Sequence, residues 1–229
     1  MKLVCIGLNI GLLLAGSCQC YSQSFMNLNF ESASLSGYSG GYTLPTASAF
    51  PDWSAYLGSP SNPTQANQST VFYDTISTGG AIVALVDSSA LNGLAPLPIQ
   101  GNYSAFLEGS IRAADTTASL GQTGTIPGTA QSIVFWESTG GSLDVSFNGQ
   151  ALSLVDVSNA VNYTVYAANI SSFAGETGQL LFTAPVQAEA VLDNIQFSTS
   201  SVPEPGVLAL SALGGVLFGW RRWRKKSSG

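Results

Sequence analysis

The sequence of 229 residues contains no histidine, and this absence removes several kinds of catalytic chemistry. A Ser-His-Asp triad, a histidine general base and a histidine-ligated zinc ion all need an imidazole ring. Cysteine is almost as scarce, because its three copies, Cys5, Cys18 and Cys20, all lie within the first twenty residues. The central part of the chain therefore has no disulfide framework, and its stability must come from a hydrophobic core.

Basic residues are nearly absent from the central part of the chain. Between residues 23 and 197, Arg112 is the one basic residue and stands against twelve acidic residues, which gives this part a net charge of −11. Such a surface repels nucleic acids and anionic lipids, so nucleic-acid binding is excluded. The remaining basic residues lie at the two ends of the sequence and are Lys2, Arg221, Arg222, Arg224, Lys225 and Lys226.

Residues 1–22 have the pattern of a secretory signal peptide. Lys2 precedes an apolar run at residues 3–15, and small residues follow that run. This order is typical of a leader that is removed after export, here by cleavage after Cys20 or Ser22. Lipidation at Cys18 is an alternative, because the preceding Leu-Ala-Gly-Ser faintly resembles a lipobox, although alanine stands where leucine is wanted.

Residues 202–226 contain three features in a fixed order. The first is a proline-rich motif of extended, accessible backbone, made of Val202, Pro203, Glu204 and Pro205. An apolar stretch at residues 206–220 follows and predicts a transmembrane helix, short for a hydrocarbon core of about 30 Å. The third feature is a basic cluster at residues 221–226, formed by Arg221, Arg222, Arg224, Lys225 and Lys226, which is expected to stay on the cytoplasmic side.

These three features resemble the PEP-CTERM sorting signal of exported bacterial proteins. The resemblance implies recognition by an exosortase, a membrane-embedded cysteine protease that cuts near the proline-rich motif. It also implies that the C-terminal helix anchors the chain in the inner membrane until processing delivers it to the cell surface or extracellular matrix. An ordinary C-terminal membrane anchor is the alternative.

The central residues 23–197 have the pattern of an all-β domain. Short runs of alternating, β-branched or aromatic residues are separated by glycine, proline and asparagine turns. About ten strands are expected, at residues 25–31, 53–57, 71–76, 81–86, 103–108, 131–137, 143–147, 151–155, 162–167, 179–183 and 190–197. Asn148 and Gly149 predict a type I′ hairpin. The sequence predicts an antiparallel β-sandwich, which a short linker at residues 198–201 separates from the C-terminal segment.

Several short segments resemble galactose-binding-like jelly rolls. Residues 27–31 and 192–197 are similar to the first and last strands of that family, and residues 50–53, 101–107 and 147–149 fit exported jelly rolls with a PEP-CTERM tail. The resemblance implies a jelly-roll arrangement for the sandwich. It implies no particular ligand, because this fold hosts many functions.

Asp193 stands at an unusual position in the pattern. It shares strand parity with Val191, Ile195 and Phe197, so a regular strand directs its carboxylate toward apolar neighbours. A buried carboxylate needs backbone N–H donors, a β-bulge or a metal ion. In similar carbohydrate-binding jelly rolls, a structural Ca²⁺ joins the first strand to the last through acids placed like Glu31 and Asp193. A calcium ion and a hydrogen-bonded aspartate are the two alternatives here.

Two aromatic residues near the start of the domain, Trp53 and Tyr56, are candidate sugar contacts. Exposed rings stack on the apolar faces of sugars, and a phenol or indole adds a hydrogen bond. The alternative is that both rings pack inside the domain, and Trp136 is expected in the core. No spacing brings two carboxylates together as a glycosidase requires, so we expect no enzyme; the acids considered are Glu108, Glu137, Asp144 and Asp156.

The sequence therefore predicts an exported, non-enzymatic β-sandwich, and two hypotheses for its function stay open. The first is a structural or adhesive component of the cell surface or extracellular matrix that associates with exopolysaccharide. The second is a lectin-like module that binds a specific carbohydrate and holds a structural calcium ion. Both hypotheses include an exosortase as the processing partner and the membrane as a partner of the C-terminal helix.

Overall fold

The computed structural model describes residues 24–36, 38, 42–77, 79–88, 96–112 and 115–202. The predicted signal peptide, Pro203, Glu204, Pro205, the predicted helix at residues 206–220 and the basic cluster lie outside these residues. Within the described ranges, no helix has the length and apolar character that a membrane span requires.

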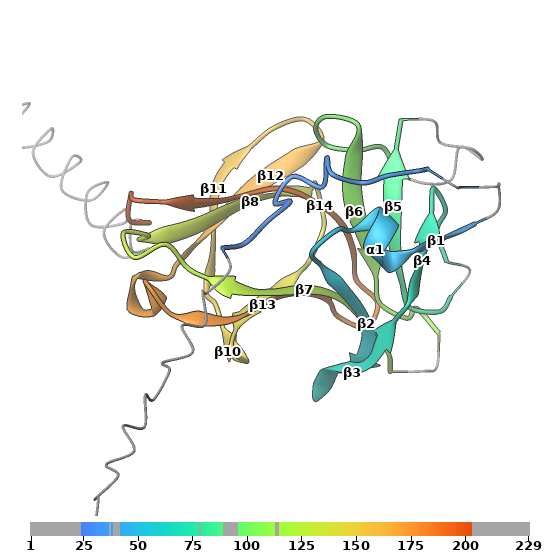
Figure 1. The fold of residues 1–229 in the computed structure, drawn as a ribbon, viewed down its shortest axis with the longest axis horizontal. Helices are drawn as coiled ribbons and strands as arrows, with labels where there is room; N and C mark the ends of the chain where they lie inside the picture. Colours follow the sequence, from blue (N-terminus) through green and yellow to red (C-terminus); the bar gives the residue numbers. More distant parts are fainter. Residues whose placement is uncertain are drawn as a thin grey trace, which may run out of the picture.

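Two β-sheets pack into a sandwich (Figure 1), as the sequence pattern predicts. The larger sheet has eight strands, which in order of pairing are β1 (Thr43–Pro45), β4 (Thr70–Tyr73), β5 (Ile82–Asp87), β6 (Tyr103–Glu108), β14 (Glu189–Ser198), β8 (Ser132–Ser138), β12 (Tyr163–Asn169) and β11 (Leu154–Asn159). The smaller sheet has six strands, which are β10 (Gln150–Ala151), β9 (Asp144–Phe147), β13 (Thr177–Ala184), β7 (Thr117–Thr125), β2 (Ser54–Ser59) and β3 (Asn62–Gln68).

The strand pairs within both sheets are antiparallel apart from β4 and β5, which run parallel. Two short helical segments complete the described elements, α1 (Thr46–Ala49) and the 3₁₀ turn η1 (Ser171–Phe173). The domain is therefore an all-β, mainly antiparallel two-sheet sandwich.

The main core lies between the two sheets. Its largest fully buried side chains are Phe30, Phe50, Phe135, Phe147, Phe182, Leu85, Leu107, Leu120, Ile126, Ile133, Ile170 and Leu180. A second, smaller apolar cluster contains Ile82, Ala84, Val86, Phe106 and Val191, with Ile76 and Ile99 packed against it. Strand β5 contributes to both clusters, which explains why its residues 82–86 are apolar on both faces rather than alternating.

The predicted hairpin at Asn148 and Gly149 is present. Strand β9 pairs with β10 through Phe147 and Gln150, so two residues form the turn. Both central residues have positive φ, +50° for Asn148 and +77° for Gly149. Positive φ at both central positions is the condition for a type I′ turn, and it fits the right-handed twist of the strands.

The prediction of a strand at residues 25–31 is wrong. The described chain begins with a single bridge between Ser24 and Thr125 of β7, and the following residues form turns, with φ of +48° at Asn27 and +58° at Phe30. These turns carry the Phe30 ring into the core, where it lies 5.8 Å from the ring of Phe50 between centroids. Core packing, rather than a sheet ladder, therefore explains the apolar residues of this segment.

The proposed linker at residues 198–201 is partly built into the sandwich. Ser198 is the last residue of β14, and its carbonyl accepts a hydrogen bond from the Gln131 N–H at 2.7 Å. The Ser132 hydroxyl donates a hydrogen bond to the carbonyl of Ser200 at 2.8 Å. The folded domain consequently extends to within a few residues of the proline-rich motif.

Candidate functional site

One row of polar side chains crosses the outer face of the six-stranded sheet. Direct strand partners link Asn67 to Tyr56, Tyr56 to Ser119, Ser119 to Thr183, and Thr183 to Asp144. Their neighbours along the strands, including Ala55, Leu120 and Phe182, lie in the core. Since successive side chains of a strand point to opposite faces, this row lies on the face away from the core.

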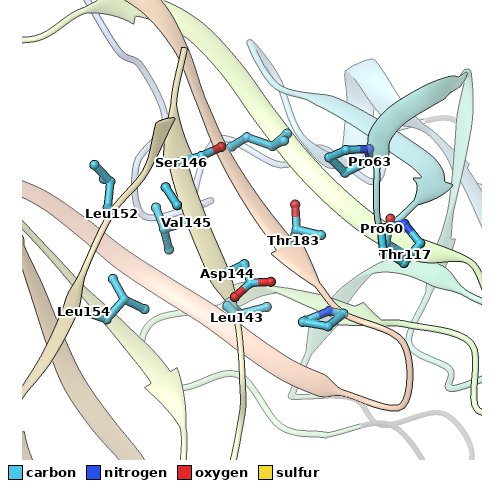
Figure 2. Close-up of a pocket in the computed structure, with 13 residues that line it drawn as sticks. Pro60, Pro63, Thr117, Leu143, Asp144, Val145, Ser146, Leu152, Leu154 and Thr183 are labelled. Atoms are coloured by element: carbon cyan, nitrogen blue, oxygen red, sulfur yellow. The ribbon is translucent and has the colours of Figure 1, made fainter. Parts of the chain in front are cut away.

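A groove of about 360 Å³ lies over this outer face. Figure 2 shows Asp144 and Ser146 of β9 on one side, Pro60 and Pro63 of the β2–β3 hairpin on the other, and Thr183 between them. The full lining is Pro60, Pro63, Thr117, Leu143, Asp144, Val145, Ser146, Ala151, Leu152, Leu154, Leu181, Thr183 and Pro185. The groove therefore combines apolar walls with hydroxyl groups and one exposed carboxylate.

Tyr56 shares the sheet face that the groove occupies. Its ring is half-buried, and the Gln179 side-chain amide donates a hydrogen bond to its hydroxyl at 3.4 Å. Glycine at position 121 leaves room beside these groups, because a Cβ there would lie 2.8 Å from a methyl of Leu181 and 3.4 Å from the Gln179 amide nitrogen. The phenol ring, the amide and the groove hydroxyls are groups that recognise sugar rings and their hydroxyls.

Trp53 is a core residue, so the structure corrects its assignment as a sugar contact. The side chain is 4% exposed, and its indole N–H donates a hydrogen bond to the carbonyl of Asn27 at 3.0 Å. Ring centroids place it 5.6 Å from Phe30 and 6.3 Å from Phe182. A ring enclosed in this way offers no face for stacking, which agrees with the core-packing alternative for Trp53.

Trp136 is not enclosed in the main core, contrary to expectation. It alternates with the core residue Phe135 on β8 and is half-buried on the other face of the eight-stranded sheet. There its ring stacks on Tyr163 of β12, with centroids 4.4 Å apart and an interplanar angle of 12°. The alternation along β8 is the signal in the sequence that could have placed Trp136 on the opposite face from Phe135.

Asp193 is buried, at 1% exposure, and a β-bulge explains how a carboxylate is accommodated there. The pairing of β14 with β8 shifts register between Asp193 and Gln196, and Asn194 has a φ of +48°. The bulge places Ile195 in the main core while Asp193 stays on the face of Val191. Strand parity therefore correctly places Asp193 on the same face as Val191, but it does not predict that Ile195, after the bulge, lies on the opposite face.

Three donors compensate the buried Asp193 carboxylate. Its Oδ2 accepts hydrogen bonds from the Gln100 N–H at 3.0 Å and the Ser104 hydroxyl at 2.7 Å, and its Oδ1 accepts one from the Asn194 N–H at 2.6 Å. Burial raises the pKa of Asp193 to about 6, the three hydrogen bonds oppose this rise, and repulsion from Glu31 adds to it. Two backbone N–H groups, the Ser104 hydroxyl and the β-bulge thus together accommodate the buried Asp193 carboxylate.

Glu31 also binds the loop that contains Gln100 and Ser104, through the residues between them. Its carboxylate accepts hydrogen bonds from the Asn102 N–H at 2.8 Å, the Asn102 side-chain amide at 2.9 Å and the Tyr103 N–H at 3.1 Å. Gly101 has a φ of +66°, and a Cβ there would lie 2.2 Å from a Glu31 oxygen. Glu31 and Asp193 together fix the loop at residues 100–104, which we call the carboxylate-bound loop.

A calcium ion at Glu31 and Asp193 would need further ligands. Ca²⁺ takes six to eight oxygen ligands, and in the described residues no three Asp, Glu, His or Cys side chains gather in one group. The two carboxylates could serve as anionic ligands through Glu31 Oε2 and Asp193 Oδ1, which accept one hydrogen bond each and keep a second lone pair, whereas Glu31 Oε1 and Asp193 Oδ2 each accept two. The remaining ligands would have to be carbonyl groups, amide side chains or water. Calcium at this position stays a prediction.

The other carboxylates considered for catalysis have separate surroundings. Glu137 is 1% exposed inside the sandwich, where the Leu143 N–H donates to it at 3.1 Å and burial raises its pKa to about 7. Glu108 accepts a hydrogen bond from the Ser77 N–H at 2.9 Å, and its pKa is raised mainly by burial. Asp144 lies at the groove, and Asp156 accepts hydrogen bonds from the Asn159 amide on β11.

Comparison with protein families identifies one segment of the chain. Residues 201–225 match the PEP-CTERM protein-sorting motif. No curated protein matches the chain.

Comparison with solved structures returns neighbours of low sequence identity. A Stig cyclase from Fischerella sp. TAU is similar over 76% of this chain and 94% of its own, with 17% identity and a TM-score of 0.48. A family 11 carbohydrate-binding module from Clostridium thermocellum is similar over 71% of this chain and 97% of its own, with 12% identity and a TM-score of 0.34. At these levels the likenesses carry no argument about ligand or activity.

The matched segment begins at Ser201, directly after the residues that hydrogen bonds hold to the sandwich. It covers the proline-rich motif, the apolar stretch and most of the basic cluster that the sequence resemblance rests on. The chain thus carries a PEP-CTERM protein-sorting motif at its C-terminus, which implies an exported protein that an exosortase sorts.

Proposed function

We propose that this chain is a non-enzymatic component of the cell surface or extracellular matrix, structural or adhesive, that associates with exopolysaccharide. The observation that carries the proposal is the sorting motif at residues 201–225, which follows a folded and strongly acidic β-sandwich almost without a spacer. A domain with net charge −11 and no histidine suits a hydrated extracellular matrix better than chemistry at an imidazole or a zinc ion.

The route of export follows from the two ends of the sequence. The signal peptide at residues 1–22 directs the chain through the inner membrane, and the helix at residues 206–220 holds it there with the basic cluster in the cytoplasm. The exosortase then acts near Val202, Pro203, Glu204 and Pro205. After processing, the jelly-roll domain reaches the cell surface or the matrix.

The alternative is a lectin-like module that binds a defined carbohydrate at the groove. Support comes from the half-buried side chains of Tyr56 and Gln179 on the outer face of the six-stranded sheet, and from Asp144 and Ser146 at the groove, which together offer a ring and hydrogen-bonding groups. Apolar walls at Pro60 and Pro63 would contact the C–H faces of a sugar chain.

Affinity electrophoresis of the mature chain through gels containing exopolysaccharide from the producing cells tests the association. We expect retarded migration, and we expect Tyr56→Ala to weaken it about five- to tenfold, the effect of losing roughly 1 kcal/mol of ring contact. Tyr42→Ala is the matched control, since Tyr42 is an exposed tyrosine on the eight-stranded side. Unretarded migration in every polysaccharide would contradict the association with exopolysaccharide. An equal loss of retardation in Tyr56→Ala and Tyr42→Ala would contradict binding on the sheet face that the groove occupies. A glycan array with a single defined hit favours the lectin-like alternative.

The structural calcium ion of this alternative has its own test. Isothermal titration of the mature chain with CaCl₂ should show binding, and the melting temperature should rise with calcium if the ion bridges Glu31 and Asp193. Asp193→Asn removes the buried anionic ligand and should abolish both effects. Absence of heat and of a melting shift in the unmodified chain would contradict calcium binding at this position.

A further inference from the structure

Both described ends of the chain lie at one end of the sandwich. Ser24 bridges Thr125 at the end of β7, and the Phe25 ring lies 5.3 Å from the Phe197 ring of β14 between centroids. The first described residues and the end of β14 lie on the left-hand side of Figure 1. We call this end the proximal end and define it as residues 24–25, 125–131, 147–153, 170–177 and 198–202.

Hydrogen bonding and packing hold the chain at the proximal end as far as Val202, the first residue of the proline-rich motif. Ser132 fixes the carbonyl of Ser200, and Val202 lines a groove together with Leu154 and Phe173. Residues 203–205 then span at most about 11 Å of extended chain before the apolar stretch begins at residue 206. The headgroup region of a bilayer is itself about 6 Å thick on each side. An embedded apolar stretch therefore leaves almost no distance between the proximal end and the lipid.

The charge distribution favours the same orientation. Of the twelve acidic residues of the domain, Glu176 is the one that lies in the proximal end as defined. The opposite, distal end carries Glu108, Asp115, Asp144 and Glu189 in residues 108–117, 138–144, 159–163 and 184–189. Electrostatic repulsion from anionic lipids falls off over a screening length of about 8–10 Å. Acidic residues at the distal end, far from the bilayer, would therefore experience little of this repulsion.

We infer that the sandwich stands with its proximal end against the lipid headgroups of the inner membrane for as long as the C-terminal helix is embedded. This inference rests on the proposed function, because it needs the sorting segment to be a membrane anchor. Its consequence concerns the groove, whose lining includes the distal residues Thr117, Asp144 and Pro185 and the proximal residues Ala151 and Leu152. The groove then runs along the side of the sandwich, from the end next to the bilayer toward the end that faces the polysaccharide outside the cell.

Fluorescence quenching by a headgroup-labelled lipid tests the orientation. The full chain, with Cys5, Cys18 and Cys20 replaced by serine, is purified from cells without exosortase. It is then reconstituted into vesicles of phosphatidylethanolamine and phosphatidylglycerol that contain a nitroxide-headgroup lipid. A single labelled cysteine replaces either Gly128, a proximal position with open space around its Cβ, or Val161, a distal residue that is 99% exposed. We expect quenching several-fold stronger at position 128 than at position 161.

A control insertion separates the orientation from the anchor. Twelve Gly and Ser residues between Pro205 and Gly206 lengthen the connection, and they should bring the quenching at the two positions close to equality. Equal quenching without the insertion, in a chain that resists carbonate extraction, would overturn the orientation alone. A chain that carbonate releases would overturn the anchor as well. Protection of position 128 only when exosortase is added would assign this end to the protease instead of the lipid.

Discussion

Glu137 links the stability of the sandwich to pH. The side chain is 1% exposed, and burial raises its pKa from 4.5 to about 7. Between these two values the folded state binds more protons than the unfolded chain, so the free energy of unfolding falls as pH rises through this window. The shift corresponds to a loss of about 3 kcal/mol that is complete slightly above pH 7. Asp193, with a pKa of about 6, acts in the same direction.

We predict that the melting temperature decreases from pH 4.5 to pH 8 and that Glu137→Gln makes this decrease markedly smaller. Glutamine keeps an acceptor for the Leu143 N–H but carries no charge. Scanning calorimetry at several pH values measures the slope, with the exposed Glu176→Gln as a control that should retain it. An unchanged slope in Glu137→Gln would rule out this assignment.

Trp53 and Tyr56 lie three residues apart, yet they should respond oppositely to substitution. Trp53→Phe removes an indole hydrogen bond to Asn27 and leaves a cavity in the core, so we expect the free energy of unfolding to fall by about 2 kcal/mol. Urea unfolding measures this loss, and polysaccharide binding per folded molecule should not change. Tyr56→Ala should weaken binding with little loss of stability. The reverse pattern would contradict the placement of both residues.

At the scale of elements, the carboxylate-bound loop depends on a glycine with no room for a side chain. Gly101→Ala would place a Cβ 2.2 Å from a Glu31 oxygen at a φ of +66°, whereas Gly140, at a φ of +81°, has open space around it. We expect Gly140→Ala to cost about 1 kcal/mol and Gly101→Ala to cost about 2–3 kcal/mol, because only the second adds a collision to the conformational cost. Equal losses in urea unfolding would show that Glu31 does not constrain the loop.

The element scale also separates what alternation predicts from what it does not. Strands β8 and β9 alternate against one core, and their residues could be predicted from the sequence almost to their ends. Strand β7, with the sequence TASLGQTGT, was not predicted, because its small and polar residues are buried by neighbouring strands rather than by their own hydrophobicity. Residues 25–31 alternate but form turns, since long-range packing of Phe30 decides their conformation.

The candidate site was predictable only in fragments. Tyr56, Glu31 and Asp193 could be selected from the sequence, because an aromatic ring and acids beside apolar positions stand out there. The groove could not be predicted, since it depends on the strand register that brings Asp144 of β9 beside Thr183 of β13 from distant segments. The donors around Asp193 depend equally on where the carboxylate-bound loop lies in space.

At the scale of the whole molecule, the folded domain and the sorting segment meet at residues 198–202. A chain that ends at Val202 keeps the hydrogen bonds of Ser198 and Ser200, so we expect it to be folded, exported and no longer anchored. A chain that ends at Phe197 loses both bonds and should unfold at a lower urea concentration, with a cost of about 1–2 kcal/mol. Circular dichroism in urea compares the two. Unfolding of the chain that ends at Val202 would refute the division between domain and tail.

The central claim is that this β-sandwich is exported and released by processing next to its sorting motif. Intact-mass spectrometry of the protein, compared between cells with and without exosortase, tests this most directly. We predict a surface or released form that lacks the signal peptide and the apolar stretch at residues 206–220 in the first cells. In the second cells, we predict a membrane-bound form that retains the stretch. An identical, uncut C-terminus in both kinds of cell would contradict the account.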